Sequence, residues 1–228
     1  TGDASDNEEI FTLYDDESDD NFTLSAETLS QGFSEGWSLF GTPLELPEDN
    51  NSMVDNLGAE FNFGPLGEYW YVYDQYGSYP SGPEDTEYEL LHGTGYILTL
   101  AQNSSLTLNG DVIDIADPST ESHTLSLNSG WNLLSNPLVA IIDKEELKIH
   151  TNNSDYPWED AVNFGFIQGS VNGWSNSDAL YYPSDQFEPW EGYWVHASRD
   201  LEFKFSPHNH NDDDLSRDLT DLWALNIY

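Results

Sequence analysis

The chain of 228 residues contains no cysteine and very few basic residues. Without cysteine it has no disulfide, no thiol nucleophile and no thiolate metal site. Lys and Arg together number 5 against 43 Asp and Glu, and residues 1–143 contain neither basic type. Because phosphate groups are bound mainly through basic side chains, nucleic acid and anionic membrane surfaces are disfavoured partners. No apolar run reaches the ~18 residues of a membrane-spanning helix, so no membrane insertion is predicted.

Helical patterns are scarce as well. Two short stretches, residues 52–61 and 143–150, could each form one or two helical turns. The rest alternates apolar and polar residues between Gly, Pro, Asn and Asp, as in "EYWYVYDQY" (68–76), "GTGYILTLAQ" (93–102) and "SLTLNGDVIDIA" (105–116). Such segments are typical of half-buried strands, and the sequence predicts an all-β fold.

One phrase occurs twice. "GWSLFGTPL" at 36–44 returns as "GWNLLSNPL" at 130–138, and "YPS", "GY" and a closing strand follow in the same order in both halves. A period near 95 residues is too long for a solenoid repeat. We therefore predict two tandem duplicated antiparallel β-sandwich or barrel modules, at 21–115 and 116–206. An acidic extension (1–20) precedes them, and an acidic tail (207–228) ending in an apolar strand follows.

The second copy, "GWNLLSNPL" followed by "PWEGYWVHA" at 189–197, resembles a module of large secreted bacterial cell-surface proteins. The first copy departs from that pattern, with "GTP" in place of "SNP" and "GYILTL" in place of "GYWVHA". The resemblance covers roughly residues 25–206. It implies an extracellular all-β accessory or scaffold role, and it transfers no catalytic residue.

A physical interpretation of the repeated phrase needs no ligand. Alternation places Trp131 and Leu133 on one face of a strand and Leu134 on the other. Gly130 and Gly192 mark tight turns or close backbone approaches. We expect Trp131 and Tyr193 to pack in one small core, so that the phrase carries folding information rather than a binding site.

No catalytic arrangement stands out. The G-x-S-x-G pattern at residues 32–36 needs a helix after it to form a nucleophile elbow, whereas a strand-like segment follows. Carboxylates are abundant, but no motif singles out a pair with the ~5–10 Å spacing of a glycosidase. We predict that the protein is not an enzyme.

The acidic sequence makes Ca²⁺ a candidate cofactor, because this ion takes oxygen ligands from carboxylates, amides and carbonyls. Two acidic clusters are candidate ligand sets: Asp15, Glu17, Asp19 and Asn21, and Asn209, Asn211 and Asp213. Neither matches an EF-hand loop, and a solvated acidic loop is the alternative. Four sequons, starting at Asn21, Asn50, Asn103 and Asn152, are possible N-glycosylation sites.

Aromatic residues are concentrated at 69–79, where alternation separates Tyr69, Tyr71 and Tyr73 from Trp70 and Val72. If one of these faces is exposed, its rings can stack on sugars, because contiguous exposed aromatics mark interaction surfaces. Burial on both faces is the alternative. The candidate glycan-binding residues are Trp70, Tyr71, Tyr73 and Trp174.

These features favour a non-enzymatic extracellular protein at the cell surface: a structural or adhesive subunit or segment of a surface layer, fibre or large adhesin. We expect self-association or contact with neighbouring domains, partly by β-strand addition through the strand-like ends. The candidate assembly residues are Ile10, Phe11, Leu222, Trp223, Leu225 and Ile227. The alternative function is a carbohydrate-binding module that uses exposed aromatics to bind a polysaccharide.

Overall fold

The computed structural model describes residues 28–61, 66, 68–80, 88–113, 115 and 121–206. Nearly half of these residues lie in short antiparallel strands and few lie in helices, so the predicted all-β class is confirmed. The predicted extensions at 1–20 and 207–228 lie outside the described residues. We call residues 28–113 the first unit and residues 121–206 the second unit.

Seventeen strands are assigned in the described residues. They are β1 (Leu29–Phe33), β2 (Gly36–Phe40), β3 (Leu44–Glu45), β4 (Trp70–Tyr73), β5 (Tyr96–Leu100), β6 (Ser104–Leu108), β7 (Asp111–Val112), β8 (His123–Leu127), β9 (Gly130–Ser135), β10 (Ile142–Asp143), β11 (Lys148–Thr151), β12 (Ser154–Pro157), β13 (Val171–Ser175), β14 (Leu180–Ser184), β15 (Gln186–Phe187), β16 (Gly192–Ala197) and β17 (Leu201–Phe205).

The helices are short, as the sequence predicts. The helix α1 (Met53–Glu60) begins at Ser52, whose hydroxyl accepts a hydrogen bond from the backbone N–H of Asp55. The segment 143–150 is helical only over the 3₁₀ turn η1 (Lys144–Glu146), after which β11 begins. The helix α2 (Trp158–Asn163) lies in the second unit.

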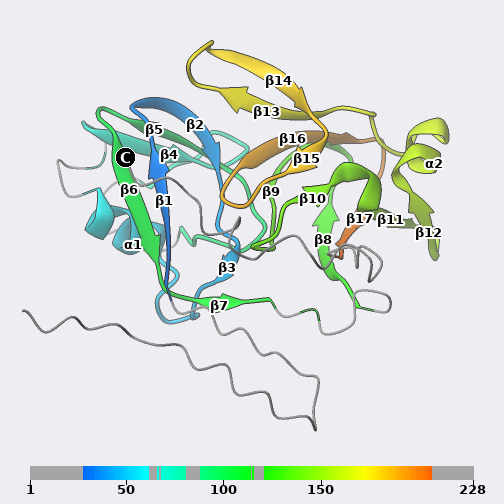
Figure 1. Cartoon of the computed structure of the whole chain (residues 1–228), viewed down its shortest axis with the longest axis horizontal. Helices are drawn as coiled ribbons and strands as arrows, with labels where there is room; N and C mark the ends of the chain where they lie inside the picture. The colour runs from blue at the N-terminus through cyan, green and yellow to red at the C-terminus, as the bar shows by residue number, and fades with distance from the viewer. Residues whose placement is uncertain are drawn as a thin grey trace, which may run out of the picture.

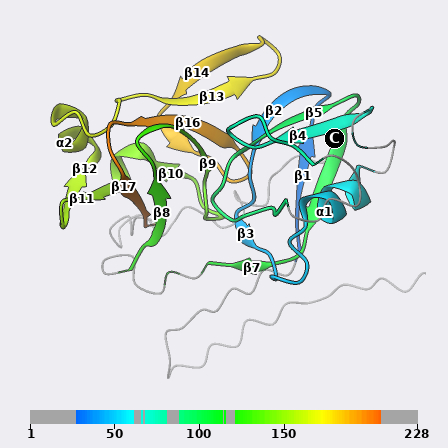
Figure 2. The same cartoon turned by 180° about the vertical axis from the view of Figure 1, so that it is seen from behind.

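Within the described ranges the strands form six antiparallel sheets, and the largest two belong to the second unit. These have the orders β14-β13-β16-β9 and β12-β11-β17-β8. The first unit has the sheet β2-β5-β4 and the pairs β1-β6 and β3-β7. Figures 1 and 2 show the two units side by side, with the β13–β14 hairpin extending over β2 and β16.

The two units pair their strands in the same register. In the first unit Trp37 lies opposite Thr99 and Phe40 opposite Tyr96. In the second unit the residues 94 positions after Trp37 and 97 after Thr99 are Trp131 and His196, which also lie opposite each other. The pair β1–β6 corresponds in the same way to β8–β17, with Leu29↔Leu108 matching His123↔Phe205. The repeated phrase thus occupies one structural position in each unit.

The units also contact each other reciprocally. The end of β2 forms a bridge between Phe40 and Glu191, and the end of β9 forms the corresponding bridge between Leu134 and Thr94. The N–H of Gly41 donates to the carbonyl of Trp190 (3.2 Å), and the N–H of Ser135 donates to the carbonyl of Gly93 (2.9 Å). Because each bond has its counterpart at the same offsets, the units meet across an approximate two-fold axis.

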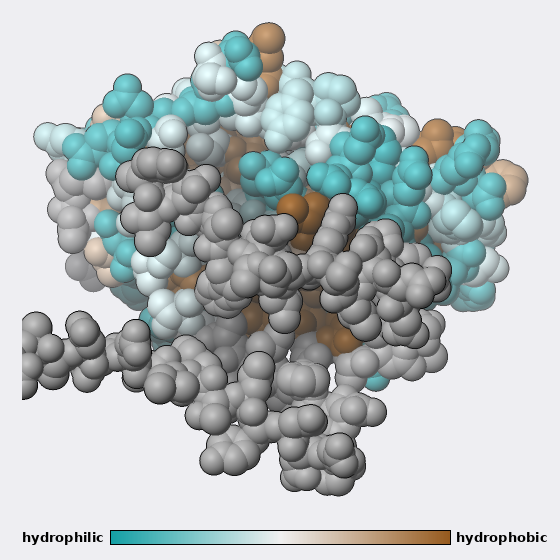
Figure 3. All heavy atoms as spheres, viewed as in Figure 1, coloured by the Kyte–Doolittle hydropathy of each residue, from teal (hydrophilic) through white to brown (hydrophobic). Residues whose placement is uncertain are grey.

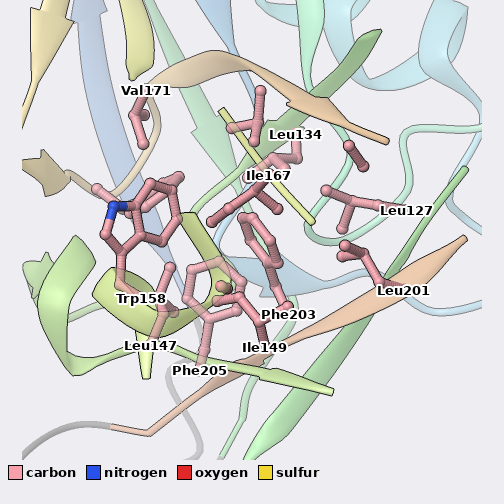
Figure 4. Close-up of a cluster of buried hydrophobic side chains, with 14 of the residues drawn as sticks. Leu127, Leu134, Leu147, Ile149, Trp158, Ile167, Val171, Leu201, Phe203 and Phe205 are labelled. Carbon is pink, nitrogen blue, oxygen red and sulfur yellow. The ribbon is translucent and has the colours of Figure 1, made fainter. Parts of the chain in front are cut away.

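Each unit has its own core, but a few side chains cross the boundary. Trp190 is 6% exposed and packs in the cluster around Phe40 and Leu98, which otherwise consists of first-unit residues. Conversely, Ile113 of the first unit packs against the second-unit cluster that contains Phe203. Figure 4 shows that second-unit cluster, with Trp158, Ile149, Phe203 and Phe205 close together. The two cores are therefore interlocked.

The expectation that Trp131 and Tyr193 share a core is wrong. Tyr193 is fully buried, whereas Trp131 is 53% exposed. Tyr193 lies opposite Leu134, and Trp131 lies opposite His196. Directly opposed residues share a face, and Trp131 and Leu134 are an odd number of positions apart, so Trp131 and Tyr193 lie on opposite faces of the sheet.

Candidate functional site

Exposed aromatic side chains gather on the outer side of the sheet β2-β5-β4. We call Trp37, Tyr71, Tyr73 and Tyr79 the aromatic face. Trp37 and Tyr79 are each 48% exposed, and Tyr71 and Tyr73 are half-buried. Elsewhere the side of the molecule seen in Figure 3 carries many hydrophilic residues, with hydrophobic residues in separate patches.

The alternation of β4 creates this face, as the sequence predicts. Trp70 and Val72 point into the first core and are 2% and 0% exposed. Tyr71 and Tyr73 point away from it, opposite Thr99 and Ile97 of β5. The prediction that Trp70 contacts a glycan is therefore wrong, because its ring packs against Phe61 in the core. Tyr71 and Tyr73 remain candidates.

The rings of the aromatic face contact one another. Tyr71 and Tyr73 are stacked, with centroids 6.1 Å apart and planes 5° apart. Trp37 stacks on Tyr73 at 6.2 Å, and Tyr79 meets Tyr73 edge-on at 5.5 Å. Desolvation, with the neighbouring Tyr71 and Tyr79 phenols, raises the pKa of Tyr73. Mutual packing holds the four rings in place without ligand. The sequence did not predict Trp37 and Tyr79 as members of this surface, because they meet only through their contacts with Tyr73 in the folded protein.

The second unit has a smaller aromatic group at the corresponding place. Trp131, the counterpart of Trp37, meets His196 edge-on at 5.2 Å. The predicted residue Trp174 is half-buried on β13 and meets Tyr181 edge-on at 5.0 Å. Its indole Nε1 is buried and has no hydrogen-bond partner among the described residues. Trp174 thus lies in a different sheet from the β4 strand that carries Tyr71 and Tyr73.

Two side chains tie these surfaces across the unit boundary. Asn176, in the β13–β14 turn, accepts a hydrogen bond from the N–H of Trp37 (3.1 Å). Gln75, which follows β4, accepts one from the N–H of Leu133 (3.1 Å). Each unit therefore positions the tryptophan-bearing strand of the other.

A polar cluster that the sequence did not reveal lies at the start of β16. The hydroxyls of Tyr182 and Tyr193 both donate to one carboxylate oxygen of Glu191, at 3.1 Å each. Burial, followed by the charge of Glu191, raises the pKa of Glu188. Burial and Glu191 likewise raise the pKa of Tyr182 to about 12. These groups hold one another in place, so we interpret the cluster as structural.

The other predicted sites are placed only in part. The Ca²⁺ clusters at 15–21 and 209–213, the sequon at Asn21 and the assembly residues at 10–11 and 222–227 lie outside the described residues. Within the described part, no group of three or more His, Asp or Glu side chains is arranged to hold a metal. Of the other sequons, Asn103 accepts a hydrogen bond from the N–H of Glu35, and Asn152 has a φ of 53° in the β11–β12 turn. Both are exposed, as is Asn50.

The G-x-S-x-G pattern forms the turn between β1 and β2, and a strand follows it, as expected. No helix in the described ranges is long and apolar enough to cross a membrane. Comparison with family models, with curated proteins and with solved structures finds no match in any of the three.

Proposed function

We propose that the protein is a non-enzymatic, extracellular structural or adhesive unit of a cell-surface assembly. In this proposal the two units are copies of one antiparallel β module, of sandwich or barrel type, that arose by tandem duplication. The matched registers of β2–β5 and β9–β16 and the reciprocal bonds between the units support the duplication. Assembly by strand addition through residues 10–11 and 222–227 remains part of the proposal.

The aromatic face is the observation that carries the adhesive role. Four rings from β2, β4 and the segment after β4 lie together and keep part of their area in solvent. Packed, partly exposed aromatic residues supply large contact areas at a small entropic cost, and they dominate binding surfaces. An excess of carboxylates elsewhere keeps the rest of the surface hydrated.

A polysaccharide is the second candidate ligand for the aromatic face. The ring of Trp37 on β2 stacks on Tyr73, and Tyr73 stacks on Tyr71 along β4, so that successive parts of an extended ligand can each contact a ring. The nearest polar groups include the Thr99 hydroxyl, on the same face as Trp37 and Tyr71. A row of rings beside hydroxyl groups suits the apolar face and the polar edge of a sugar chain.

The test is a pull-down of the purified chain on bacterial cell surfaces and on insoluble polysaccharides. We expect a Trp37→Ala/Tyr73→Ala variant to bind about tenfold more weakly, because two ring contacts are lost. Leu180→Ala is the matched control, since Leu180 is 63% exposed but lies on β14 outside the aromatic face. Equal binding by the double variant and the wild type would rule out the aromatic face as the contact surface.

A further inference from the structure

We propose that the cleft between the two units is a second binding site, one that takes a neutral sugar residue of a glycan chain. This cleft has a volume of about 480 Å³, which is in the usual range for small-molecule sites. It is lined from the first unit by the segments 74–76 and 88–96 and from the second unit by β8 and β9. It contains no residue of the aromatic face, so it goes beyond the function proposed above.

Residues related by the approximate two-fold axis differ at the edge of this cleft. Trp190 and Gly93, 97 positions apart, make corresponding backbone bonds and share a φ of +69°. The indole of Trp190 fills a place in the first core. Gly93 has no side chain, and the Leu125 side chain of the second unit occupies the place next to it, since a Cβ added to Gly93 would lie 2.4 Å from Leu125. At the edge of the cleft, the ring that Trp190 supplies in the other unit thus has no counterpart, and Leu125 lies against Gly93 instead.

The walls of the cleft combine apolar and polar groups. Leu133 and Leu134 are buried residues of the lining, and Tyr76 and Tyr88 contribute aromatic residues to it. Tyr76 is 77% exposed, so its ring is available to a ligand. The apolar face of a pyranose stacks on such rings, while its hydroxyls need hydrogen-bond acceptors at the edge.

Carboxylates supply those acceptors. Asp74 and Glu89 both line the cleft, and both lie close enough to Tyr96 to contribute to its pKa, which burial raises to about 12. One oxygen of Asp74 accepts the N–H groups of Tyr76 and Ser78 (2.8 Å each), which fixes the carboxylate. No Lys or Arg is among the described lining residues. Acidic sugars would meet uncompensated negative charge, and this favours neutral ones.

The test uses the full chain and labelled neutral hexasaccharides of the β-glucan, xylan, mannan and chitin types, with affinity measured by fluorescence anisotropy. The first variant, Gly93→Trp/Leu125→Gln, gives the cleft the residues found at the corresponding positions of the other unit, Trp190 and Gln31. The second, Tyr76→Ala/Tyr88→Ala, removes the rings without adding bulk. Leu180→Ala serves as the control again.

We expect at least one hexasaccharide to bind the wild type. Both cleft variants should bind it at least about tenfold more weakly, because the first adds bulk to the cleft and the second removes two ring contacts. Trp37→Ala should retain this binding, which separates the cleft from the aromatic face. Full binding by the ring-deleted variant, loss of binding only with Trp37→Ala, or binding of a lysine-rich peptide in place of every sugar would overturn the proposal. Absence of binding by all four hexasaccharides would do so too.

Discussion

His92 and His123 meet where the two units join. Their rings are edge-on with centroids 4.8 Å apart, and Nε2 of His92 lies 2.6 Å from the carbonyl oxygen of Pro137. Burial lowers the pKa of both imidazoles, and the neighbouring His92 contributes to lowering that of His123 to about 4. The hydrogen bond to Pro137, followed by the charge of Glu45, acts in the opposite direction on the pKa of His92. The contact therefore favours two neutral rings.

This contact makes stability depend on pH. The unfolded chain holds the His123 proton up to about pH 6.5, whereas the folded chain holds it only below about pH 4. Unfolding therefore takes up a proton between these values, and the free energy of unfolding should decrease as the pH falls from 6.5 to 4. Urea titrations across this range should show a shallower decrease for His123→Gln. Parallel curves for variant and wild type would contradict the prediction.

The sequence predicted correctly which residues share a face of one strand, because alternation alone decides this. The two-residue period of a strand placed Trp70 and Val72 opposite Tyr71 and Tyr73, and the structure agrees. It failed for Trp131 and Tyr193, because the pairing register between two distant strands decides which faces coincide. Which face of β4 is buried was also open, since both carry aromatic rings.

At the level of elements, the ends of β2 and β9 lie close together at the boundary between the units. A Cβ on Gly41 would lie 2.2 Å from Oγ of Ser135 and 2.6 Å from the carbonyl oxygen of Thr94. Gly41 and Ser135 are corresponding positions, 94 residues apart, so two strands of the same kind meet near the axis. Only one of the two positions has room for a side chain.

We therefore predict that Gly41→Ala lowers the free energy of unfolding by about 1–3 kcal/mol through overpacking. The exchange Gly41→Ser/Ser135→Gly should recover most of this loss, because it moves the side chain to the other side of the axis. Gly32→Ala on β1 is the control, since a Cβ there meets nothing within 4 Å. Denaturant unfolding of the variants measures the effect, and an exchange variant no more stable than Gly41→Ala would refute the two-fold relation.

At the level of the whole molecule, the units share their cores through Trp190. Its backbone belongs to the second unit, yet its indole lies among first-unit residues. Lys144 and Lys204 pair with Asp185 and Asp155, but most carboxylates have no basic partner available, since 43 face only 5 bases. Cohesion between the units therefore depends on buried apolar contacts and backbone bonds rather than on ion pairs.

Trp190→Ala should lower the free energy of unfolding by about 3–5 kcal/mol, because it leaves a cavity in the first core. Hydrogen exchange should then show lost protection in β2 and β5, although the substitution lies in the other unit. Trp131→Ala removes a ring that is 53% exposed, and as a control it should change stability by only about 0.5 kcal/mol. Loss of protection confined to second-unit strands would show that Trp190 does not join the cores.

The sequence by itself determined the all-β class, the alternation within each strand and the positions of the repeated phrase, because these follow from local periodicity and turn residues. Only the tertiary structure decided that Trp37 and Trp131 are exposed, that Trp190 fills the neighbouring core and that a cleft remains beside Gly93. These features depend on which distant strands pair and in which register, and this is set by packing the two units against each other rather than by local sequence.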